Sequence, residues 1–249
     1  MSFLENKVIA ITGGGRGIGR GIALEALVQG AKVAILDINA ERLATLPEGM
    51  LCVDGDVSVS QDLETFYATI LKQFGQLDYV VANAVNTARE DQESEEAFFE
   101  RMLQVNFKGM YYTMKLAMPH LNNNGAMVSM LAASAIHEIA TMPGAWAEYT
   151  AIKQAVKYLS RSLAAHNEQG IRINMVSPGF IDGERVDAIS ECAGWQQTDL
   201  ENTAILKRMG NVQDVSSAVF FLLSPEASYI TGNDLWVDGG WAINGAKMP

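Results

Sequence analysis

Tyr149 and Lys153 are four residues apart in a stretch of the sequence with helical periodicity. Positions i and i+4 share one face of a helix, so the phenol and the ammonium can point into one site. A phenol has a reference pKa of about 10, and an ammonium about 4 Å away at an effective dielectric of about 20 stabilises the phenolate by about 4 kcal/mol. The pair is therefore a candidate general acid and base for a hydroxyl or carbonyl group. By itself this spacing is common on exposed helix surfaces.

A glycine-rich run, Thr12-Gly13-Gly14-Gly15-Arg16-Gly17-Ile18-Gly19, follows a short apolar segment and opens a helical pattern. This order of strand, glycine turn and helix is the context that a dinucleotide site requires. Glycines let the backbone approach a pyrophosphate, whose charge faces the helix N-terminus. The alternative is a tight turn between strand and helix that binds no ligand.

The next predicted strand ends at Asp37, where a carboxylate can accept hydrogen bonds from both hydroxyls of an adenosine ribose. The same charge would repel a 2′-phosphate by a few kcal/mol at about 4 Å. Asp37 therefore predicts NAD rather than NADP. Arg16 in the turn argues the other way, because a basic residue there can pair with a 2′-phosphate.

Strand-like and helix-like segments alternate along the chain. Short apolar runs predict strands at residues 7–12, 32–37, 50–53, 79–83, 126–130, 172–177 and 234–237. Longer periodic stretches predict helices at residues 18–29, 61–74, 95–120, 147–168 and 212–223. This alternation predicts the α/β class, as a single doubly wound Rossmann-type parallel sheet with helices on both faces. We expect residues 1–249 to form one dinucleotide-binding and catalytic domain.

Composition argues against several other classes of protein. Hydrophobic residues make up 49% of the 249, enough for a sizeable core, which argues against disorder. The net charge of −11 argues against nucleic acid and anionic membranes as partners. No apolar stretch approaches the ~20 residues that span a bilayer, and we expect a cytoplasmic protein. The 2 cysteines form no CxxC pair, and no histidine or carboxylate spacing indicates a metal site.

Further motifs occur in order along the whole chain: Asp56-Val57, Asn83-Ala84, Val105-Asn106, Ser177-Pro178-Gly179, Ile230-Thr231-Gly232 and Val237-Asp238-Gly239-Gly240. Together with the glycine turn, Asp37 and the Tyr149–Lys153 pair, they resemble the short-chain dehydrogenase/reductase family. The agreement of several ordered motifs is far more specific than any one of them.

The resemblance implies a role for each matching residue in binding NAD. Gly13, Arg16, Gly17, Ile18 and Gly19 would surround the pyrophosphate. Asp37 would bind the adenosine ribose, Asp56 and Val57 would contact adenine, and Asn83 would lie along the adenosine. Ile181, after the Pro-Gly turn, would contact the nicotinamide amide.

The resemblance also implies the reaction, a hydride transfer between NAD(H) and a secondary alcohol or ketone. Tyr149 would exchange the proton with the substrate oxygen, and Lys153 would lower the pKa of Tyr149 and bind the nicotinamide ribose. Asn106 would hold a water that links Lys153 to solvent. A substrate lid around residues 184–208 and a homotetramer or homodimer are implied as well. A low-turnover NAD-binding sensor or scaffold, and a non-redox lyase or cyclase, are the alternatives.

The chain departs from the family at the catalytic serine. The family register puts Ala132 at that position, and the nearest serine downstream is Ser134. A local bulge of two residues would let Ser134 polarise the substrate carbonyl as a hydrogen-bond donor. The alternative is that the serine has been lost and the reaction weakened or altered.

Two further departures fall in the predicted cofactor site. Val85 stands where the family has a glycine that allows close approach to the cofactor, so the local geometry must differ. Gly183 stands where the family often has a threonine that bonds the nicotinamide carboxamide. We therefore expect one cofactor contact to be missing and cofactor binding to be weaker.

Overall fold

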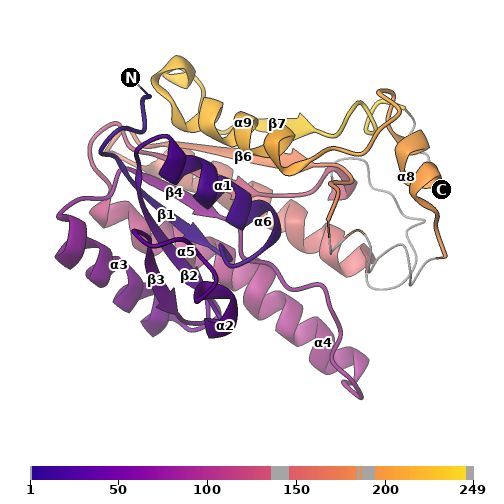
Figure 1. The fold of residues 1–249 in the computed structure, drawn as a ribbon. Coiled ribbons are helices and arrows are strands. Elements are labelled where there is room, and N and C mark those ends of the chain that lie inside the picture. The colour runs from indigo at the N-terminus through magenta and orange to yellow at the C-terminus, as the bar shows by residue number, and fades with distance from the viewer. Residues whose placement is uncertain (1, 136–145, 184–185, 187–193, 245–249) are drawn as a thin grey trace.

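A seven-stranded parallel sheet with strand order β3-β2-β1-β4-β5-β6-β7 runs through the molecule (Figure 1). The computed structural model describes residues 2–135, 146–183, 186 and 194–244. The strands are β1 Val8–Thr12, β2 Lys32–Asp37, β3 Leu51–Asp54, β4 Tyr79–Ala82, β5 Ala126–Met130, β6 Arg172–Pro178 and β7 Asp234–Val237. The predicted α/β class and doubly wound sheet are confirmed.

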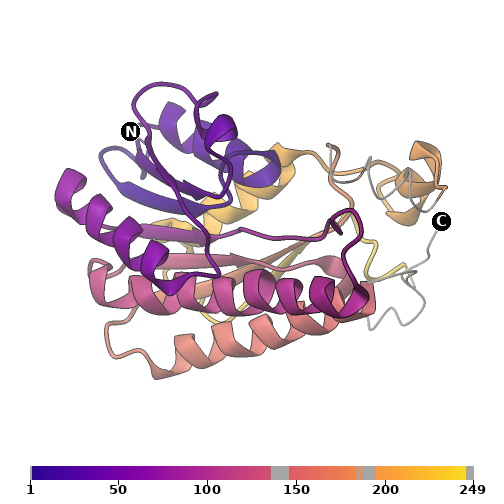
Figure 2. The same cartoon turned by 90° about the horizontal axis from the view of Figure 1, so that it is seen from below.

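Helices cover both faces of the sheet. The α-helices are α1 Gly17–Val28, α2 Ala40–Leu43, α3 Ser60–Phe74, α4 Glu95–Met102, α5 Met110–Ala117, α6 Trp146–His166, α8 Gln197–Thr203 and α9 Val212–Leu223. A π-helix, η1 Leu103–Gly109, joins α4 to α5, and the 3₁₀ segments are η2 Met118–His120, η3 Ala133–Ala135 and η4 Pro225–Ala227. Figure 2 shows α5 and α6 below the sheet, with α1 and α9 above it.

The central strands β1 and β4 are buried at every position, as strands covered on both faces should be. The outer strand β3 instead alternates between half-buried and exposed residues, because successive side chains point to opposite faces of the sheet. The buried strands form one continuous core with the inner faces of the surrounding helices. This core holds the carboxyl ends of the strands in fixed positions.

The strand order reverses between β1 and β4, and ligands of open parallel sheets bind at such a switch point. The glycine-rich turn follows β1, Asp37 ends β2, and Asn83 follows β4. Because all strands are parallel, these residues lie along one edge of the sheet. Helix α6 returns towards the amino ends of the strands, so its first turns lie at the same edge.

The helix predicted over residues 95–120 is interrupted by the π-helical turn η1. A π-turn changes the helical phase without changing the residue types, so a periodicity argument does not detect it. Helices α2 and α8 were not predicted, because 4 and 7 residues are too few to show a period. The ends of the other elements differ from the prediction by at most two residues. Within the described residues, no helix is both long and apolar enough to cross a membrane.

Candidate active site

The glycine-rich turn packs tightly against the end of β4. Gly13 and Gly17 have positive φ angles of 68° and 54°, which side chains disfavour. A Cβ atom on Gly13 would lie 2.7 Å from the Cα of Ala84, and one on Gly19 would lie 2.3 Å from the carbonyl oxygen of Gly13. Glycine is therefore required at positions 13 and 19 by the turn itself, before any ligand is considered.

Helix α1 begins at this turn with N–H groups that its own N-cap residue does not satisfy. Arg16 occupies the N-cap, its side chain makes no capping hydrogen bond, and the first turn holds no acidic residue. Asn83 fixes the turn by donating from Nδ2 to the carbonyls of Thr12 and Gly13, at 3.1 and 3.0 Å. Such a helix N-terminus suits the pyrophosphate of a dinucleotide, so the residues present fit that cofactor.

Asp37 is bound to the same turn. Its Oδ2 accepts the Gly15 N–H at 2.8 Å, its Oδ1 accepts the Asn39 N–H at 3.1 Å, and the residue is 7% exposed. The carboxylate is thus fixed beside the glycine turn, where an adenosine ribose would lie. Sequence reasoning missed Arg42, whose Cβ lies 3.0 Å from an ideal Cβ on Gly15. The sequence feature that could have predicted this is Asn39, a residue type that favours helix N-caps. Asn39 caps α2 by accepting the Arg42 N–H and so fixes Arg42 beside the glycine turn.

Asp56 and Val57 follow β3 at the same edge. Asp56 Oδ1 accepts the Ser58 N–H at 2.8 Å, and the Asp56 N–H donates to Asp62 at 2.9 Å, which fixes the turn. Val57 is 6% exposed and packs on Gly109, where an added Cβ would lie 2.7 Å from its Cγ2. Both residues thus lie in a fixed turn at the carboxyl end of β3, with Val57 mostly covered and packed on Gly109 of η1.

Tyr149 and Lys153 lie on one face of α6, as their spacing predicts. Tyr149 is 2% and Lys153 1% exposed, and Lys153 Nζ lies 5.6 Å from the centre of the Tyr149 ring. Lys153 Nζ also donates to the carbonyl of Met130, the last residue of β5, at 2.7 Å. The ammonium is therefore both buried and close to the phenol.

Apolar side chains pack against the Tyr149 ring. Tyr149 shares a buried cluster with Phe98, Met102 and Ile152, and Val85 and Ala132 are among the partly buried residues that pack on this cluster. Two of the departures from the family pattern, which are far apart in sequence, are thus in one cluster with the tyrosine. Sequence reasoning did not predict that they would meet.

Ser134 lies in η3, directly after β5, and is 4% exposed. The next residues, 136–145, lie outside the described part of the chain. The preceding serine, Ser129, shares a buried hydrogen bond of 3.0 Å with Ser160 inside the core. Of these two serines, only Ser134 stands beyond the carboxyl end of β5.

Asn106 lies in η1 with 0% exposure, and its side chain binds the segment after β4. Its Oδ1 accepts the Asn86 N–H and its Nδ2 donates to the Asn86 carbonyl, both at 2.7 Å. The π-helical turn is thus bound to the same segment that carries Val85. The Asn106 side chain thus fixes the backbone of the segment after β4.

Ile181 is 8% exposed and pairs with Gly210 in an isolated parallel bridge. Gly183, two residues later, has a φ of +140°, a conformation that a threonine would rarely adopt. The backbone at position 183 therefore differs from one that would present a threonine side chain. Of the predicted lid, residues 184–185 and 187–193 lie outside the described residues, and α8 lies within the remainder.

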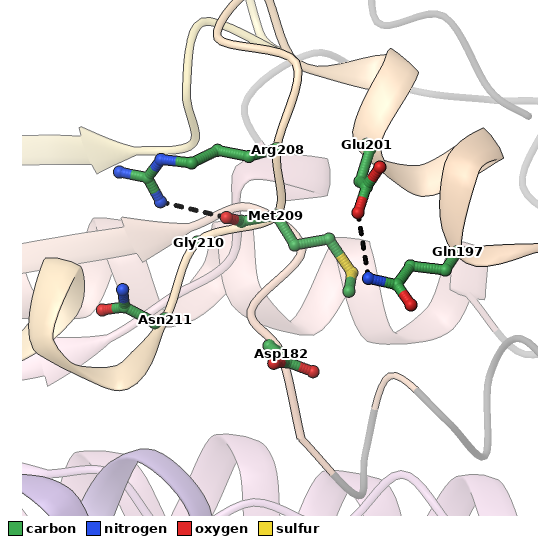
Figure 3. A pocket seen from close by; sticks show the side chains of 7 residues that line it. All are labelled: Asp182, Gln197, Glu201, Arg208, Met209, Gly210 and Asn211. Atoms are coloured by element: carbon green, nitrogen blue, oxygen red, sulfur yellow. Dashed lines mark hydrogen bonds between the residues drawn. The ribbon is translucent and has the colours of Figure 1, made fainter.

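A cavity of about 260 Å³ borders this bridge (Figure 3). It is lined by Asp182, Gln197, Glu201, Arg208, Met209, Gly210 and Asn211. Arg208 is engaged with Asp214 at 2.7 and 3.0 Å, and Gln197 donates to Glu201 at 2.9 Å. Neighbouring residues in an extended segment point to opposite sides, so the exposed Asp182 and the buried Ile181 face different surroundings. The cavity is thus lined mostly by polar side chains, with Met209 as the apolar one, and Ile181 is not among its lining residues.

In the part of the chain that the structure describes, no group of three or more histidine, cysteine, aspartate or glutamate side chains could hold a metal ion. The predicted residues at positions 13–19, 37, 56, 57, 83, 106, 134, 149, 153 and 181 follow the carboxyl ends of strands or lie on η1 and α6. They form an anion-binding helix end, a fixed carboxylate and a buried phenol with its ammonium. This set can bind a dinucleotide and transfer a proton.

Known proteins are similar to this chain in sequence and in fold. The family described as Enoyl-(Acyl carrier protein) reductase matches residues 13–242. Tropinone reductase-like 3 of Erythroxylum coca is 31% identical over 95% of this chain and 93% of its own length. L-fucose dehydrogenase of Mus musculus is 34% identical over 95% of this chain and 88% of its own length. A Brucella melitensis structure, titled short-chain dehydrogenase/reductase, glucose/ribitol dehydrogenase, superposes with a TM-score of 0.85 at 29% identity and covers 97% of this chain and 99% of that one.

Proposed function

This chain belongs to the short-chain dehydrogenase/reductase family, and from that membership and its site we propose an NAD-dependent alcohol dehydrogenase or ketone reductase. The chain is an oxidoreductase that uses a nicotinamide cofactor, NAD or NADP, on alcohol or ketone substrates. The proposal concerns NAD, the secondary alcohol and the residues that act. The observation that carries it is the buried contact between Lys153 and Tyr149 at the switch-point edge.

The preference for NAD rests on Asp37. Its carboxylate is fixed by two backbone N–H groups beside the turn, so it cannot easily move away from a 2′-phosphate. Each oxygen has a further lone pair for a ribose hydroxyl. Arg16 and Arg42 are the basic residues near this position that favour NADP. The fixed position of Asp37 favours NAD.

The remaining contacts to NAD follow the order of the sheet edge. Gly13, Gly17, Ile18 and Gly19 with Arg16 would bind the pyrophosphate at the start of α1. Asp56, Val57 and Asn83 would line the adenosine, and Ile181 would contact the nicotinamide amide. With a glycine at 183, we propose that one carboxamide contact is missing and that NAD binds less tightly than in relatives with a threonine.

Proton transfer is the task of Tyr149. In alcohol oxidation its phenolate accepts the proton of the substrate hydroxyl, and the Lys153 ammonium stabilises that phenolate. Ser134 donates a hydrogen bond to the substrate oxygen, in the manner of an oxyanion donor. When bound, NAD supplies the hydride acceptor. The buried apolar cluster around Tyr149 excludes water and strengthens the effect of the ammonium.

Asn106 serves the proton path indirectly. Its side chain is engaged with Asn86, so we propose that its main-chain carbonyl, in the π-helical turn, holds the water that links Lys153 to solvent.

We further propose that residues 1–249 act as one catalytic domain with a lid around 184–208. The protein would act in the cytoplasm as a homotetramer or homodimer.

The test is the rate of NADH formation, followed by absorbance, with a panel of secondary alcohols and aldoses. We expect Tyr149→Phe to reduce kcat at least about 100-fold, because general acid–base catalysis contributes that much or more. Tyr158→Phe is the matched control, since Tyr158 lies on the same helix and is 74% exposed. If Tyr149→Phe turned over normally, the proposal would fail.

The same assay separates the alternatives. Tight NADH binding without turnover of any substrate would favour a sensor or scaffold. Product formation without a change in NADH absorbance would favour a lyase or cyclase. A greater kcat/KM with NADP than with NAD would overturn the argument from Asp37.

A further inference from the structure

Lys153 contacts a sulfur atom that takes no part in the proposed proton transfer. Its Nζ lies 3.1 Å from Sδ of Met110, the first residue of α5, and 2.7 Å from the Met130 carbonyl oxygen. Both Lys153 and Met110 are 1% exposed. Met110 is 43 residues away in sequence, and the fold alone brings its thioether to the ammonium.

A buried ammonium is costly unless hydrogen bonds replace the water it has lost. The Met130 carbonyl and the Met110 thioether are both uncharged, so neither cancels the field of the ammonium at Tyr149. A thioether is also a weaker acceptor than a carbonyl oxygen. It can therefore hold the ammonium in place and still be displaced by a better acceptor.

Three cationic side chains on the segment from α4 to α5 have partners of their own. Lys108 of η1 donates to the Ser58 carbonyl, Lys115 of α5 lies over the Tyr111 ring, and Arg101 of α4 pairs with Glu93. Glu148, next to Tyr149, has a buried Oε2 without a hydrogen-bond partner among the described residues. The effect of Glu148 on the ionisation of Tyr149 is the same in two variants that differ only at a residue of α5. It therefore cancels when those two variants are compared.

We propose that Met110 is a positioning residue for the reaction. Its thioether holds the Lys153 ammonium against Tyr149 in the cofactor-free protein and releases it to a ribose hydroxyl of NAD. This inference rests on the proposed function of Tyr149 and Lys153. It assigns to the Met110 thioether a share, beside the Met130 carbonyl, in keeping the ammonium in place before NAD binds.

The first measurement needs no cofactor. Tyrosinate absorbance near 295 nm is titrated with pH in each variant and in the same variant carrying Tyr149→Phe, and the difference isolates the ionisation of Tyr149. Met110→Leu removes the acceptor with little change of volume. Met114→Leu is the matched control, because Met114 lies one turn later in α5, is 0% exposed, and contacts Ser160 at 3.8 Å.

We expect Met110→Leu to move the ionisation of Tyr149 to higher pH by about half a unit. A shift of the Lys153 ammonium from about 5.5 to about 7 Å from Tyr149, at a dielectric of about 20, raises the pKa of Tyr149 by that amount. Met114→Leu should not move it. Met110→Gln, whose amide oxygen is a stronger acceptor, should restore the titration but weaken NADH binding about 2- to 10-fold, the range of one net hydrogen bond.

Identical titrations of Met110→Leu and Met114→Leu would overturn the inference. So would NADH binding by Met110→Gln, measured by protein fluorescence, as tight as in the parent protein. Failure of the proposed function looks different, because Tyr149→Phe would then keep its turnover. If Tyr149→Phe is inactive and the two leucine variants titrate alike, only the role of Met110 is wrong.

Discussion

Single atoms at the sheet edge decide much of the chemistry of this protein. Asp37 uses both carboxylate oxygens to bind backbone N–H groups, so the residue that would select the cofactor also holds the glycine turn. Lys153 likewise combines a structural contact, to the end of β5, with its proposed catalytic role. Substitutions that test the function of such residues must therefore change the charge of the side chain while changing its shape as little as possible.

Asp37→Asn tests the charge of this side chain in cofactor selection. The amide is uncharged and keeps one acceptor oxygen, so one of the two backbone N–H groups loses its acceptor, an effect common to both cofactors. Repulsion of a 2′-phosphate should fall by about 2 kcal/mol. We expect the ratio of kcat/KM for NAD to that for NADP to drop about 30-fold. Asp56→Asn, at the predicted adenine position, should affect both cofactors equally. An unchanged ratio in Asp37→Asn would show that this carboxylate does not select the cofactor.

Ser134→Ala tests the displaced serine. Loss of one oxyanion-type donor costs about 3 to 4 kcal/mol of barrier, so kcat should fall about 100-fold or more. Ser129→Ala makes the same change at the buried Ser160 contact and should lower the melting temperature without lowering kcat. If Ser134→Ala turned over normally while Ala132→Ser turned over faster, the serine has been lost from this site.

At the scale of elements, the segment from α4 through η1 to α5 connects the sheet edge to α6. It carries Phe98 and Met102 of the cluster around Tyr149, Asn106 at the segment after β4, and Met110 at Lys153. The π-turn sets the phase at which these side chains face the site. The loop before α4 is held by Glu93, which binds Arg101 at 2.9 and 2.5 Å.

This ion pair predicts a dependence of stability on pH. The hydrogen bond from Arg101 lowers the pKa of Glu93 from 4.5 to about 2. A carboxyl group with a lower pKa in the folded state stabilises the protein above its unfolded pKa, and that stabilisation is lost as the pH falls towards 2. In urea unfolding, we expect Glu93→Gln to be less stable than the parent by a constant amount above pH 5.

The difference between Glu93→Gln and the parent should then shrink steadily between about pH 4.5 and 2. Glu96→Gln, at an exposed position of α4, is the control and should show no such trend. A difference in unfolding free energy that stayed constant down to pH 2 would mean that the pair does not lower the pKa of Glu93.

At the scale of the whole molecule, β7 is the last strand of the sheet, and large apolar side chains are exposed around it. Trp236 on β7 is 42% exposed, Phe221 on α9 is 43% exposed, and Tyr229 between them is fully exposed. Exposed apolar groups at a sheet edge are typical of contacts between subunits. This side of the molecule therefore supports the proposed homotetramer or homodimer.

Trp236→Glu tests that assembly, because burying a carboxylate in a subunit contact costs several kcal/mol. We expect light scattering after size exclusion to give a smaller mass for this variant than for the parent. Val28→Glu, at an 86% exposed position at the end of α1, should leave the mass unchanged. A parent protein that is monomeric at micromolar concentration would contradict the proposed oligomer.

Local residue patterns are enough to predict the strands, the glycine turn and the face shared by Tyr149 and Lys153. Each follows from residues close together in the chain: apolar runs, a left-handed turn that needs glycine, and a spacing of one helical turn. Tertiary structure alone decided which distant residues meet. The π-turn, the approach of Val85 and Ala132 to the cluster of Tyr149, and the sulfur of Met110 at Lys153 arise from packing between elements, which no local pattern encodes.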